Sequence, residues 1–425
     1  MRREFLKACA AAGLGLAVPF RPSEAHAKPK DEPYTGPYYV VFNASGGWDT
    51  TYLMDPKGVN GINRLYKDGD ILTKGAHKYA PIKKHAQGGM PNEDFYAEFG
   101  EELLTLNGLD YSVNNHSPGA RYMATGKLDS LAYPTFAALV AACCGPDCPL
   151  AFLTFGNYSA TGNLVAMSRV PYLPSLQRIA NADAIEGNAR SPYHDKFALD
   201  RIEEALREEN TARGADPRLP RAARADNMLY AAQVNSKALQ RVTQYIPKTS
   251  PKGRLEQQAE IALASFKAGV CVSANLTIGQ FDSHANNDPD QMKLIPEFLA
   301  GIAYLIRRAG DLKVREQLVV IVQSEMGRTP TYNAGNGKDH WSIGSALFLG
   351  RGIKGNRVVG ATDEKQFAVP IDAKTLKLDK EKGNRVRPEH VHEALREYAG
   401  IADHPLSKKF PLGVAAGDRL RGVWG

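Results

Sequence analysis

Four polar segments contain the side chains best suited to chemistry, because each places Asp, Glu or His directly after an apolar run. In the first, Asn-Ala-Ser-Gly-Gly-Trp-Asp-Thr-Thr, the glycines permit a sharp turn and Asp49 offers a carboxylate to a metal ion. In the second, Asp282 and His284 stand two residues apart, so in extended backbone both side chains project to one side and can bind one ion. An ordinary turn and a hydrogen-bonded Asp-His pair are the purely structural alternatives.

The third and fourth segments add a carboxylate, an imidazole and two cations. Glu325 follows Leu-Val-Val-Ile-Val, where an unpaired buried carboxylate would be costly. Arg328 is its partner in a structural interpretation; in a functional one, Glu325 binds metal and the Arg328 guanidinium faces a phosphate or sulfate group. The fourth segment is a glycine-rich loop that ends in Lys338, Asp339 and His340. Together the four segments predict a composite hydrolytic metal site.

The elements that position these segments follow from the hydrophobic pattern. Short apolar runs predict buried strands, and two stretches between them have helical periodicity. The strands are expected at residues 38–42, 150–155, 270–278, 318–322 and 346–349, and the helices at residues 257–266 and 292–307. This alternation predicts an α/β fold with a mainly parallel sheet, helices on both faces and ligands beyond the carboxyl ends of the strands.

Residues 158–251 depart from the alternation and predict a helical insertion. Two charged amphipathic helices are expected near residues 197–209 and 226–245, with Pro-rich loops between them. Three roles stay open for this insertion: it covers the site, it forms a surface for a partner, or it is a plain crossover connection. The polar tail at residues 353–384 predicts surface hairpins, followed by a helix at residues 389–398.

The first 27 residues predict an export signal that is removed from the mature protein. Arg2 and Arg3 precede Glu-Phe-Leu-Lys, a small apolar run and an Ala-His-Ala cleavage site, as in twin-arginine signal peptides. The apolar run is shorter than the roughly 20 residues that span a bilayer, so no permanent membrane anchor is expected. Residues 28–425 are therefore expected to form a single domain in the periplasm or outside the cell, delivered by the twin-arginine translocase.

Composition and charge pattern argue against a nucleic-acid partner. With 43% hydrophobic and 23% charged residues the chain is an ordinary globular protein. Loss of the signal removes four positive and two negative charges, which lowers the formal charge from +7 to +5. Charges of both signs are interleaved, which argues against nucleic-acid binding. No dinucleotide fingerprint or haem-attachment motif is present.

Three cysteines stand together in Cys143-Cys144-Gly-Pro-Asp-Cys148. In an oxidising compartment a local disulfide is the favoured interpretation. A redox or soft-metal role is the alternative, although the spacing is not that of a zinc knuckle. Cys271 lies in an apolar run and is expected in the core.

The four segments contain, in this order, Ser-Gly-Gly-Trp-Asp-Thr, Phe-Asp-Ser-His-Ala-Asn, Ser-Glu-Met-Gly-Arg-Thr-Pro and Gly-Lys-Asp-His-Trp. As an ordered set they resemble the exported bacterial family called domain of unknown function 1501. The resemblance covers most of the mature chain. That family is grouped with sulfatases and alkaline phosphatases, so it implies an alkaline-phosphatase-like three-layer sandwich with two metal ions side by side over the sheet.

The sequence departs from the pattern of the wider superfamily at the position of the nucleophile. In the wider superfamily a nucleophilic Ser, Thr or modified Cys starts a helix a short distance ahead of a Thr-Gly pair. Here Thr125 and Gly126 form the pair, and the expected position holds His116, with Ser117 beside it. Three interpretations stay open: His116 is a metal ligand, His116 is a nucleophile, or Ser117 attacks from a shifted register. The ligand interpretation is favoured, because imidazoles commonly coordinate metals.

By motif position, the resemblance assigns two groups of ligands and an anion site. Asp49, Glu325 and His116 would hold one ion; Asp282, His284 and His340 would hold the other. Lys338 and Arg328 would bind the substrate anion, and Asp339 would orient His340.

These assignments imply a hydrolase of phosphate or sulfate esters that uses metal-activated water. Two divalent ions are expected, zinc or manganese, with calcium as an alternative. The competing hypothesis is a non-catalytic exported protein that binds metal, an envelope partner or a polysaccharide.

Overall fold

The computed structural model describes residues 33–58, 61–170, 172–173, 184–185, 188–214 and 236–425. The chain divides into two compact units, one of Glu32–Tyr193 and Ser236–Gly425, the other of Met1–Asp31 and His194–Asn235. The predicted signal peptide lies outside the described residues. In the second unit, helix α6 (Lys196–Gly214) confirms the helix expected at residues 197–209.

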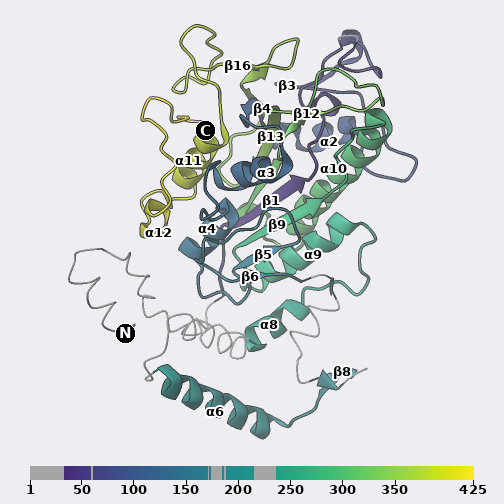
Figure 1. The fold of residues 1–425 in the computed structure, drawn as a ribbon. Coiled ribbons are helices and arrows are strands. Elements are labelled where there is room, and N and C mark those ends of the chain that lie inside the picture. Colours follow the sequence, from purple (N-terminus) through teal and green to yellow (C-terminus); the bar gives the residue numbers. More distant parts are fainter. Residues whose placement is uncertain (1–32, 59–60, 171, 174–183, 186–187, 215–235) are drawn as a thin grey trace, which may run out of the picture. The chain divides into compact units, whose positions relative to one another are not determined.

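The larger unit is built on an eight-stranded sheet (Figure 1). Its strand order is β14-β4-β13-β10-β1-β9-β5-β6. Neighbouring strands are parallel except at β13, which runs antiparallel to both β10 and β4. The strands are β1 (Tyr38–Ala44), β4 (Leu104–Asp110), β5 (Phe152–Thr154), β6 (Met167–Ser168), β9 (Ser273–Ile278), β10 (Leu318–Gln323), β13 (Ile343–Gly350) and β14 (Arg357–Val359).

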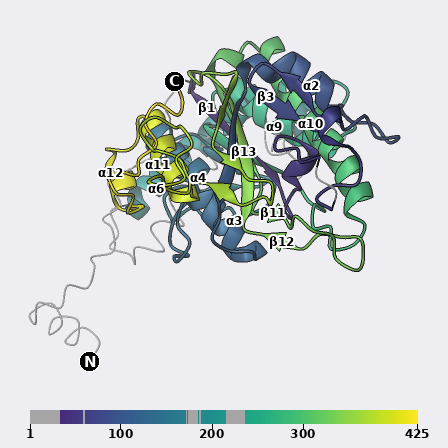
Figure 2. The ribbon, with the colours of Figure 1, turned by 90° about the horizontal axis from the view of Figure 1, so that it is seen from above.

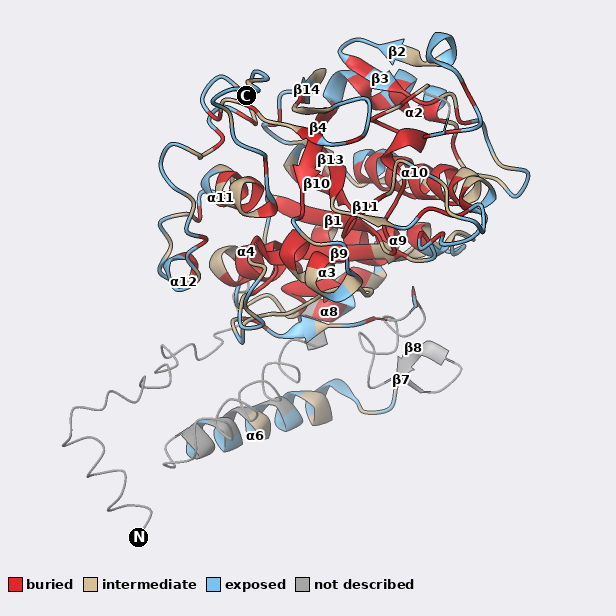
Figure 3. Ribbon diagram, turned by 45° about the horizontal axis from the view of Figure 1, so that its top comes forward, coloured by how far each residue is buried: buried red, intermediate tan, exposed pale blue. Residues whose placement is uncertain are grey.

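Helices cover both faces of this sheet, and the central strand shows why. Tyr38, Val40 and Phe42 of β1 pack into one hydrophobic core, whereas Tyr39 and Val41 pack into the other. Alternate residues of a strand point to opposite faces, so an uninterrupted apolar run needs a cover on each side. Figure 2 shows the sheet between the two helical layers, and Figure 3 shows its strands buried.

The helices of the two layers contribute to separate cores. Core residues of α2, α9 and α10 pack with one face of β1, and those of α4 and α11 with the other. The described helices of this unit are α2 (Asn92–Phe99), α3 (His116–Thr125), α4 (Phe136–Cys144), α8 (Ser236–Thr243), α9 (Arg254–Lys267), α10 (Asn287–Asp311), α11 (Pro388–Tyr398) and α12 (Pro405–Lys408). The predicted three-layer α/β sandwich with a mostly parallel sheet is therefore confirmed.

All five expected strands and the helices α9, α10 and α11 are present. The helix expected near residues 226–245 is described only over α8, because residues 215–235 lie outside the described part of the chain. The sequence analysis missed β4, whose Asn107, Gly108 and Asp110 are poor strand formers. It also missed α4, a short helix that is apolar on all sides and has no helical period to detect.

The described residues also form small two-stranded sheets, separate from the central one. They pair β2 (Leu72–Lys74) with β3 (His77–Tyr79), β7 (Ala184–Ile185) with β8 (Asn188–Pro192), β11 (Gly327–Arg328) with β12 (His340–Trp341), and β15 (Ala361–Thr362) with β16 (Ala368–Val369). The β15–β16 pair confirms a hairpin in the polar tail, but β14 instead extends the central sheet. Within the described residues, no helix is long and apolar enough to cross a bilayer.

Candidate metal centre

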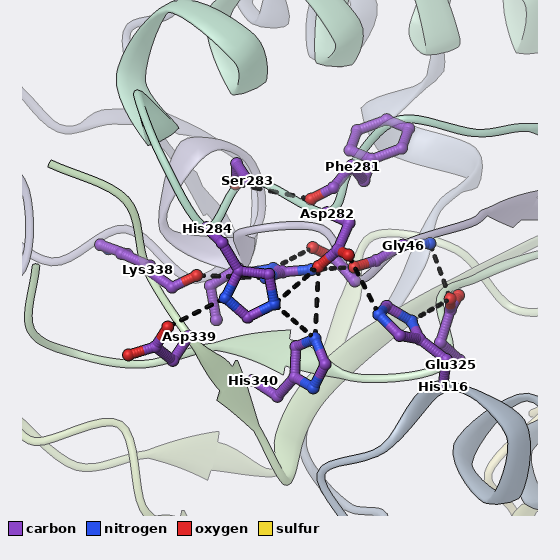
Figure 4. Close-up of polar contacts among 12 residues, drawn as sticks. Gly46, His116, Phe281, Asp282, Ser283, His284, Glu325, Lys338, Asp339 and His340 are labelled. Atoms are coloured by element: carbon purple, nitrogen blue, oxygen red, sulfur yellow. Dashed lines mark hydrogen bonds and ion pairs between the residues drawn. The ribbon is translucent and has the colours of Figure 1, made fainter. Parts of the chain in front are cut away.

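The polar segments that follow β1, β9 and β10 meet at one edge of the sheet, together with the start of α3. Asp282 follows β9, Glu325 follows β10, and His116 is the first residue of α3. His340 comes from β12, which pairs with β11, a strand that begins two residues after Glu325. Figure 4 shows these side chains pointing toward one another. Because β1, β9 and β10 are parallel, their carboxyl ends lie on the same edge of the sheet.

Asp282, His284 and His340 present three donor atoms in a triangle. The Nε2 atoms of His284 and His340 lie 2.9 Å apart, and Asp282 Oδ1 lies 3.1 Å from the first and 3.2 Å from the second. In a tetrahedral zinc site with bonds of about 2.0 Å, ligand atoms are about 3.3 Å apart. The spacing of the three donors therefore fits one bound divalent ion.

The second nitrogen of each imidazole identifies the atom that is available for metal. His284 Nδ1 lies 2.9 Å from Asp339 Oδ1, and His340 Nδ1 lies 2.9 Å from the carbonyl oxygen of Asn114. Carboxylate and carbonyl oxygens only accept hydrogen bonds, so each Nδ1 is the donor to its partner and each Nε2 is the nitrogen left for a metal ion. A divalent cation between the two Nε2 atoms would be favoured by the neighbouring carboxylate of Asp282.

His116 links this triangle to Glu325. Its Nε2 lies 3.2 Å from Asp282 Oδ2 and its Nδ1 lies 3.2 Å from Glu325 Oε1. His116, Asp282 and His340 each place a ligand atom within 4.8 Å of the others, which makes them a candidate metal group. The hydrogen bond to Glu325 raises the pKa of His116 against the opposing effect of burial.

The two carboxylate oxygens of Glu325 differ in their hydrogen-bond partners. The side chain is 3% exposed, and Oε1 accepts a hydrogen bond of 2.7 Å from the backbone N–H of Gly46. Oε2 is buried and has no hydrogen-bond partner among the described residues. A buried, unpartnered carboxylate oxygen is unfavourable unless a cation or a donor occupies the space beside it. This oxygen therefore fits a metal ligand.

The guanidinium of Arg328 is held inside the site. It is fully buried and donates to the carbonyl oxygens of Gly47 (2.8 Å), Lys338 (3.1 Å) and Gly46. Its Nη2 also lies 2.7 Å from Asp282 Oδ1. Partial burial by itself raises the pKa of Asp282, but the contacts with Arg328 and the nearby imidazoles outweigh it and lower that pKa to about 2. Asp282 is therefore an anion at neutral pH, ready to coordinate a cation.

Asp49 does not join the cluster but forms a buried ion pair. Its Oδ2 lies 2.7 Å from Lys338 Nζ, and both side chains are fully buried. The side-chain amide of Asn287 donates to the same oxygen at 3.1 Å, and the hydroxyl of Thr51 donates to Oδ1 at 2.6 Å. The Asp49 carboxylate is thus neutralised by an ammonium group and by hydrogen bonds.

The start of α3 is brought to the site by a close approach of backbone. The Asn115 side chain caps the helix by accepting from Ser117 N at 3.3 Å. Gly119 faces the Glu325 backbone so closely that a Cβ there would lie 2.5 Å from the Glu325 carbonyl oxygen. Without a side chain at this position, α3 can hold His116 against Glu325.

Of the predicted site residues, His116, Asp282, His284, Glu325 and His340 come together. Asp49 instead contacts Lys338, and Arg328 and Lys338 are buried in ion pairs, so an anion would reach them only if these pairs opened. Ser117 is exposed beside His116. The expectation that Asp339 orients His340 is wrong: Asp339 contacts His284, and Asn114 holds His340.

Asn114 and Gly119 are functional positions that the sequence analysis missed. Asn114 acts through its backbone carbonyl, which leaves no mark in the residue type. Gly119 acts by having no side chain, and its role requires knowledge of the helix–loop packing. The N-cap residue Asn115 was the one available signal, since Asn commonly precedes a helix.

The predicted disulfide among the clustered cysteines is wrong. Cys143 and Cys144 are free thiols, so neither of them is joined to Cys148. Cys143 lies in the last turn of α4, where its Sγ lies 3.3 Å from His404 Nδ1. Burial raises the pKa of the Cys143 thiol to about 12, which keeps it protonated and unreactive. Cys271 is buried in the core, as expected.

Several solved structures are similar to this chain. The sulfatase PsFucS1 from Pseudoalteromonas sp. is 9% identical, with 91% of this chain and 74% of that chain covered and a TM-score of 0.41. A putative sulfatase from Bacteroides thetaiotaomicron is 11% identical, with coverages of 91% and 75% and a TM-score of 0.36. The lipoteichoic acid synthase LtaP from Listeria monocytogenes is 7% identical, with coverages of 91% and 74% and a TM-score of 0.36.

No curated protein matches the sequence. The sequence profile of one family does: it is described as protein of unknown function (DUF1501) and matches residues 40–377, the span that holds all of the clustered donors. The chain belongs to the DUF1501 family.

Proposed function

We propose that this protein is an exported, metal-dependent hydrolase of phosphate or sulfate esters. The observation that carries the proposal is the triangle of His284 Nε2, His340 Nε2 and Asp282 Oδ1, with sides of 2.9, 3.1 and 3.2 Å. The three donors lie at the carboxyl edge of a parallel sheet, where α/β enzymes bind their ligands. A divalent ion there would polarise an ester and lower the pKa of a water molecule.

Two imidazoles and one carboxylate would hold the first ion. This donor set suits zinc or manganese better than calcium, which prefers a shell of oxygen atoms. A second ion has possible donors in His116 and in the unpartnered Oε2 of Glu325. Asp49 would have to leave Lys338 to contribute, so our proposal is one firmly held ion and a second site that does not depend on Asp49.

His116 remains our preferred ligand. Glu325 Oε1, 3.2 Å from His116 Nδ1, can accept the proton of that nitrogen, which would leave Nε2, 3.2 Å from Asp282 Oδ2, for a metal ion. A nucleophilic role would require His116 to be free of metal, and attack by Ser117 is the remaining alternative. Ser117 is exposed next to His116, and Ser117→Ala tests the last of these possibilities: activity survives the change unless the hydroxyl attacks.

The start of α3 would help to hold the anionic part of a substrate. The first backbone N–H groups of a helix have no partner within the helix, and the helix dipole favours negative charge there. His116 begins α3, so these groups lie beside the proposed metal ion. The Ser117 N–H donates to Asn115 Oδ1, Pro118 has no N–H, and the Gly119 N–H donates to the Asn115 carbonyl oxygen. The His116 N–H and the helix dipole are therefore what α3 would offer to the ester oxygens without opening the buried pairs of Arg328 and Lys338.

The test is elemental analysis of the mature protein purified without chelator, followed by assays with phosphate and sulfate esters. One or more tightly bound ions, lost in His340→Ala and kept in His85→Ala, are expected. His85 is a suitable control because its Nδ1 accepts a local hydrogen bond from Gln87 at 3.2 Å. Absence of metal after reconstitution, with a normally folded protein, would favour the competing proposal of a non-catalytic exported binding protein.

Export is the remaining part of the proposal. It rests on Arg2, Arg3 and the Ala-His-Ala site. Replacing both arginines by lysine should leave the uncut protein inside the cell, as seen by fractionation and mass. Normal maturation of the double variant would point to a different export route.

A further inference from the structure

A pocket of about 580 Å³ opens beside the proposed metal centre. His116 and Glu325, which belong to that centre, line part of it. The pocket is therefore continuous with the cluster, and a ligand bound to the metal ion would extend into it. The other lining residues are Ser45, Gly46, Ser117, Ala120, Arg121, Leu131, Asn157, Tyr158, Gly279 and Gln280.

One side of the pocket is a stripe of α3. His116, Ser117, Ala120 and Arg121 all line the pocket. Residues three and four positions apart on a helix share a face, which brings Ala120 beside His116 and Ser117, and Arg121 beside Ser117. The five-residue step from His116 to Arg121 covers about 7.5 Å along the helix axis. Arg121 therefore lies well beyond the metal centre but along the same wall.

The guanidinium of Arg121 has unused donors. Its Nε donates to the carbonyl oxygen of Leu128 at 2.9 Å, which fixes the side chain. Among the described residues, no carboxylate forms an ion pair with Arg121. It is also the only lysine or arginine among the described residues that line the pocket. A half-buried cation with a fixed stem and free terminal nitrogens is suited to receive an anion in a bidentate manner.

The pocket lining also includes Asn157 and Gln280, which have polar side chains. Their φ angles of 59° and 81° lie in the left-handed region, which is more usual for Asn and uncommon for Gln. Strained backbone of this kind is concentrated at ligand sites. Arg121 is also close enough to Tyr158 to lower the pKa of that phenol, although burial has the larger, opposite effect.

We propose that the substrate carries a second anionic group, and that Arg121 recognises it. This inference rests on the proposed function, because it assumes that an ester anion is held at the metal centre. The substrate class is thus a phosphate or sulfate ester that carries another acidic group on the side that faces α3. Arg121 is a specificity-determining residue in this scheme and takes no part in ester cleavage.

The experiment is calorimetric titration of the metal-loaded mature protein with methylphosphonate and with alkane bisphosphonates of increasing length. Methylphosphonate probes the metal centre alone, whereas a long bisphosphonate can also reach Arg121. At one chain length, a gain of about tenfold in affinity over methylphosphonate is expected from the added charge-assisted hydrogen bonds. In Arg121→Ala this gain should disappear while methylphosphonate affinity stays the same.

Two further variants keep the outcomes distinct. Arg121→Lys should recover part of the gain, because the charge remains but the planar fork is lost. Arg357→Ala is the matched control, since Arg357 also donates to a backbone carbonyl, at 3.1 Å, but lies outside the pocket. A gain that persists in Arg121→Ala, or no gain at any length with normal methylphosphonate binding, would overturn the role of Arg121. Failure to bind any probe would instead count against the proposed function.

Discussion

The imidazole rings of His284 and His340 approach each other through their Nε2 atoms, which lie 2.9 Å apart. The Nδ1 atom of each ring has its own hydrogen-bond partner: the Asp339 carboxylate for His284 and the Asn114 carbonyl oxygen for His340. His284 comes from the segment after β9 and His340 from β12, so the tertiary fold alone creates this contact. It is the most specific indication of a bound cation in the described part of the molecule.

The role of Asp339 leads to the first prediction. Asp339→Ala should weaken zinc binding about 10- to 100-fold, because His284 loses the partner that fixes its tautomer and orientation. Competition with a fluorescent zinc chelator measures the change. Asp403→Ala is the control: Asp403 is exposed and pairs with Lys408 at 3.0 Å. Equal zinc affinity in Asp339→Ala and the control would contradict a supporting role for Asp339.

The contact between α3 and the Glu325 loop leads to the second prediction. In Gly119→Ala the new methyl group would lie 2.5 Å from the Glu325 carbonyl oxygen, so the helix must shift. We expect a loss of about 1–3 kcal/mol in the free energy of unfolding, measured by urea denaturation, together with weaker metal binding.

A second glycine provides the control for this substitution. Gly310 lies in α10, and an added Cβ there meets nothing within 4 Å. Gly310→Ala should instead stabilise the protein by about 0.5–1 kcal/mol, since alanine is the better helix former. Equal effects of the two substitutions would show that the approach of α3 to the loop is not tight.

The buried pair of Asp49 and Lys338 leads to the third prediction. Lys338→Met leaves the Asp49 carboxylate buried without its counter-charge, which should cost about 3–5 kcal/mol in the free energy of unfolding. Lys408→Met, which breaks the exposed pair with Asp403, should cost less than about 1 kcal/mol.

Lys338→Met also tests whether Asp49 can bind metal. If Asp49 only pairs with Lys338, the zinc content should stay unchanged in this variant. An additional equivalent of zinc, accompanied by recovered stability, would mean that Asp49 can serve as a ligand once the ammonium is removed.

His392 leads to a prediction about pH. It is buried on α11 and lies 2.8 Å from the carbonyl oxygen of Met123 on α3. Burial lowers the pKa of His392 from 6.5 to about 4 in the folded protein. Between these values the unfolded chain binds the proton and the folded chain does not, so stability rises with pH across this window.

The contribution of His392 should therefore be complete above pH 6.5 and be lost as the pH falls toward 4, by up to about 3 kcal/mol. His392→Gln cannot take up this proton and keeps a donor for the Met123 carbonyl. Chemical denaturation at several pH values should show a shallower acid loss in this variant. An unchanged pH profile would mean that other groups cause the acid sensitivity.

Much of the fold was predictable from the sequence, because burial on both faces of a parallel sheet requires continuous apolar runs. The run at residues 38–42 and the run before Glu325 gave the central strands β1 and β10. The pattern failed where tertiary contacts override local preference. β4 contains Asn107 and Gly108 and is a strand only because β13 and β14 flank it.

The sequence by itself determined which donors exist and that they follow strand ends, since residue type and order along the chain carry that information. It did not determine how they pair. Asp49 carries the same carboxylate as Asp282, yet one is neutralised by a buried ammonium and the other faces two imidazoles. Only the tertiary structure decided this, because pairing depends on distances between segments as far as 289 residues apart in the chain and on the space that glycines such as Gly119 leave between them.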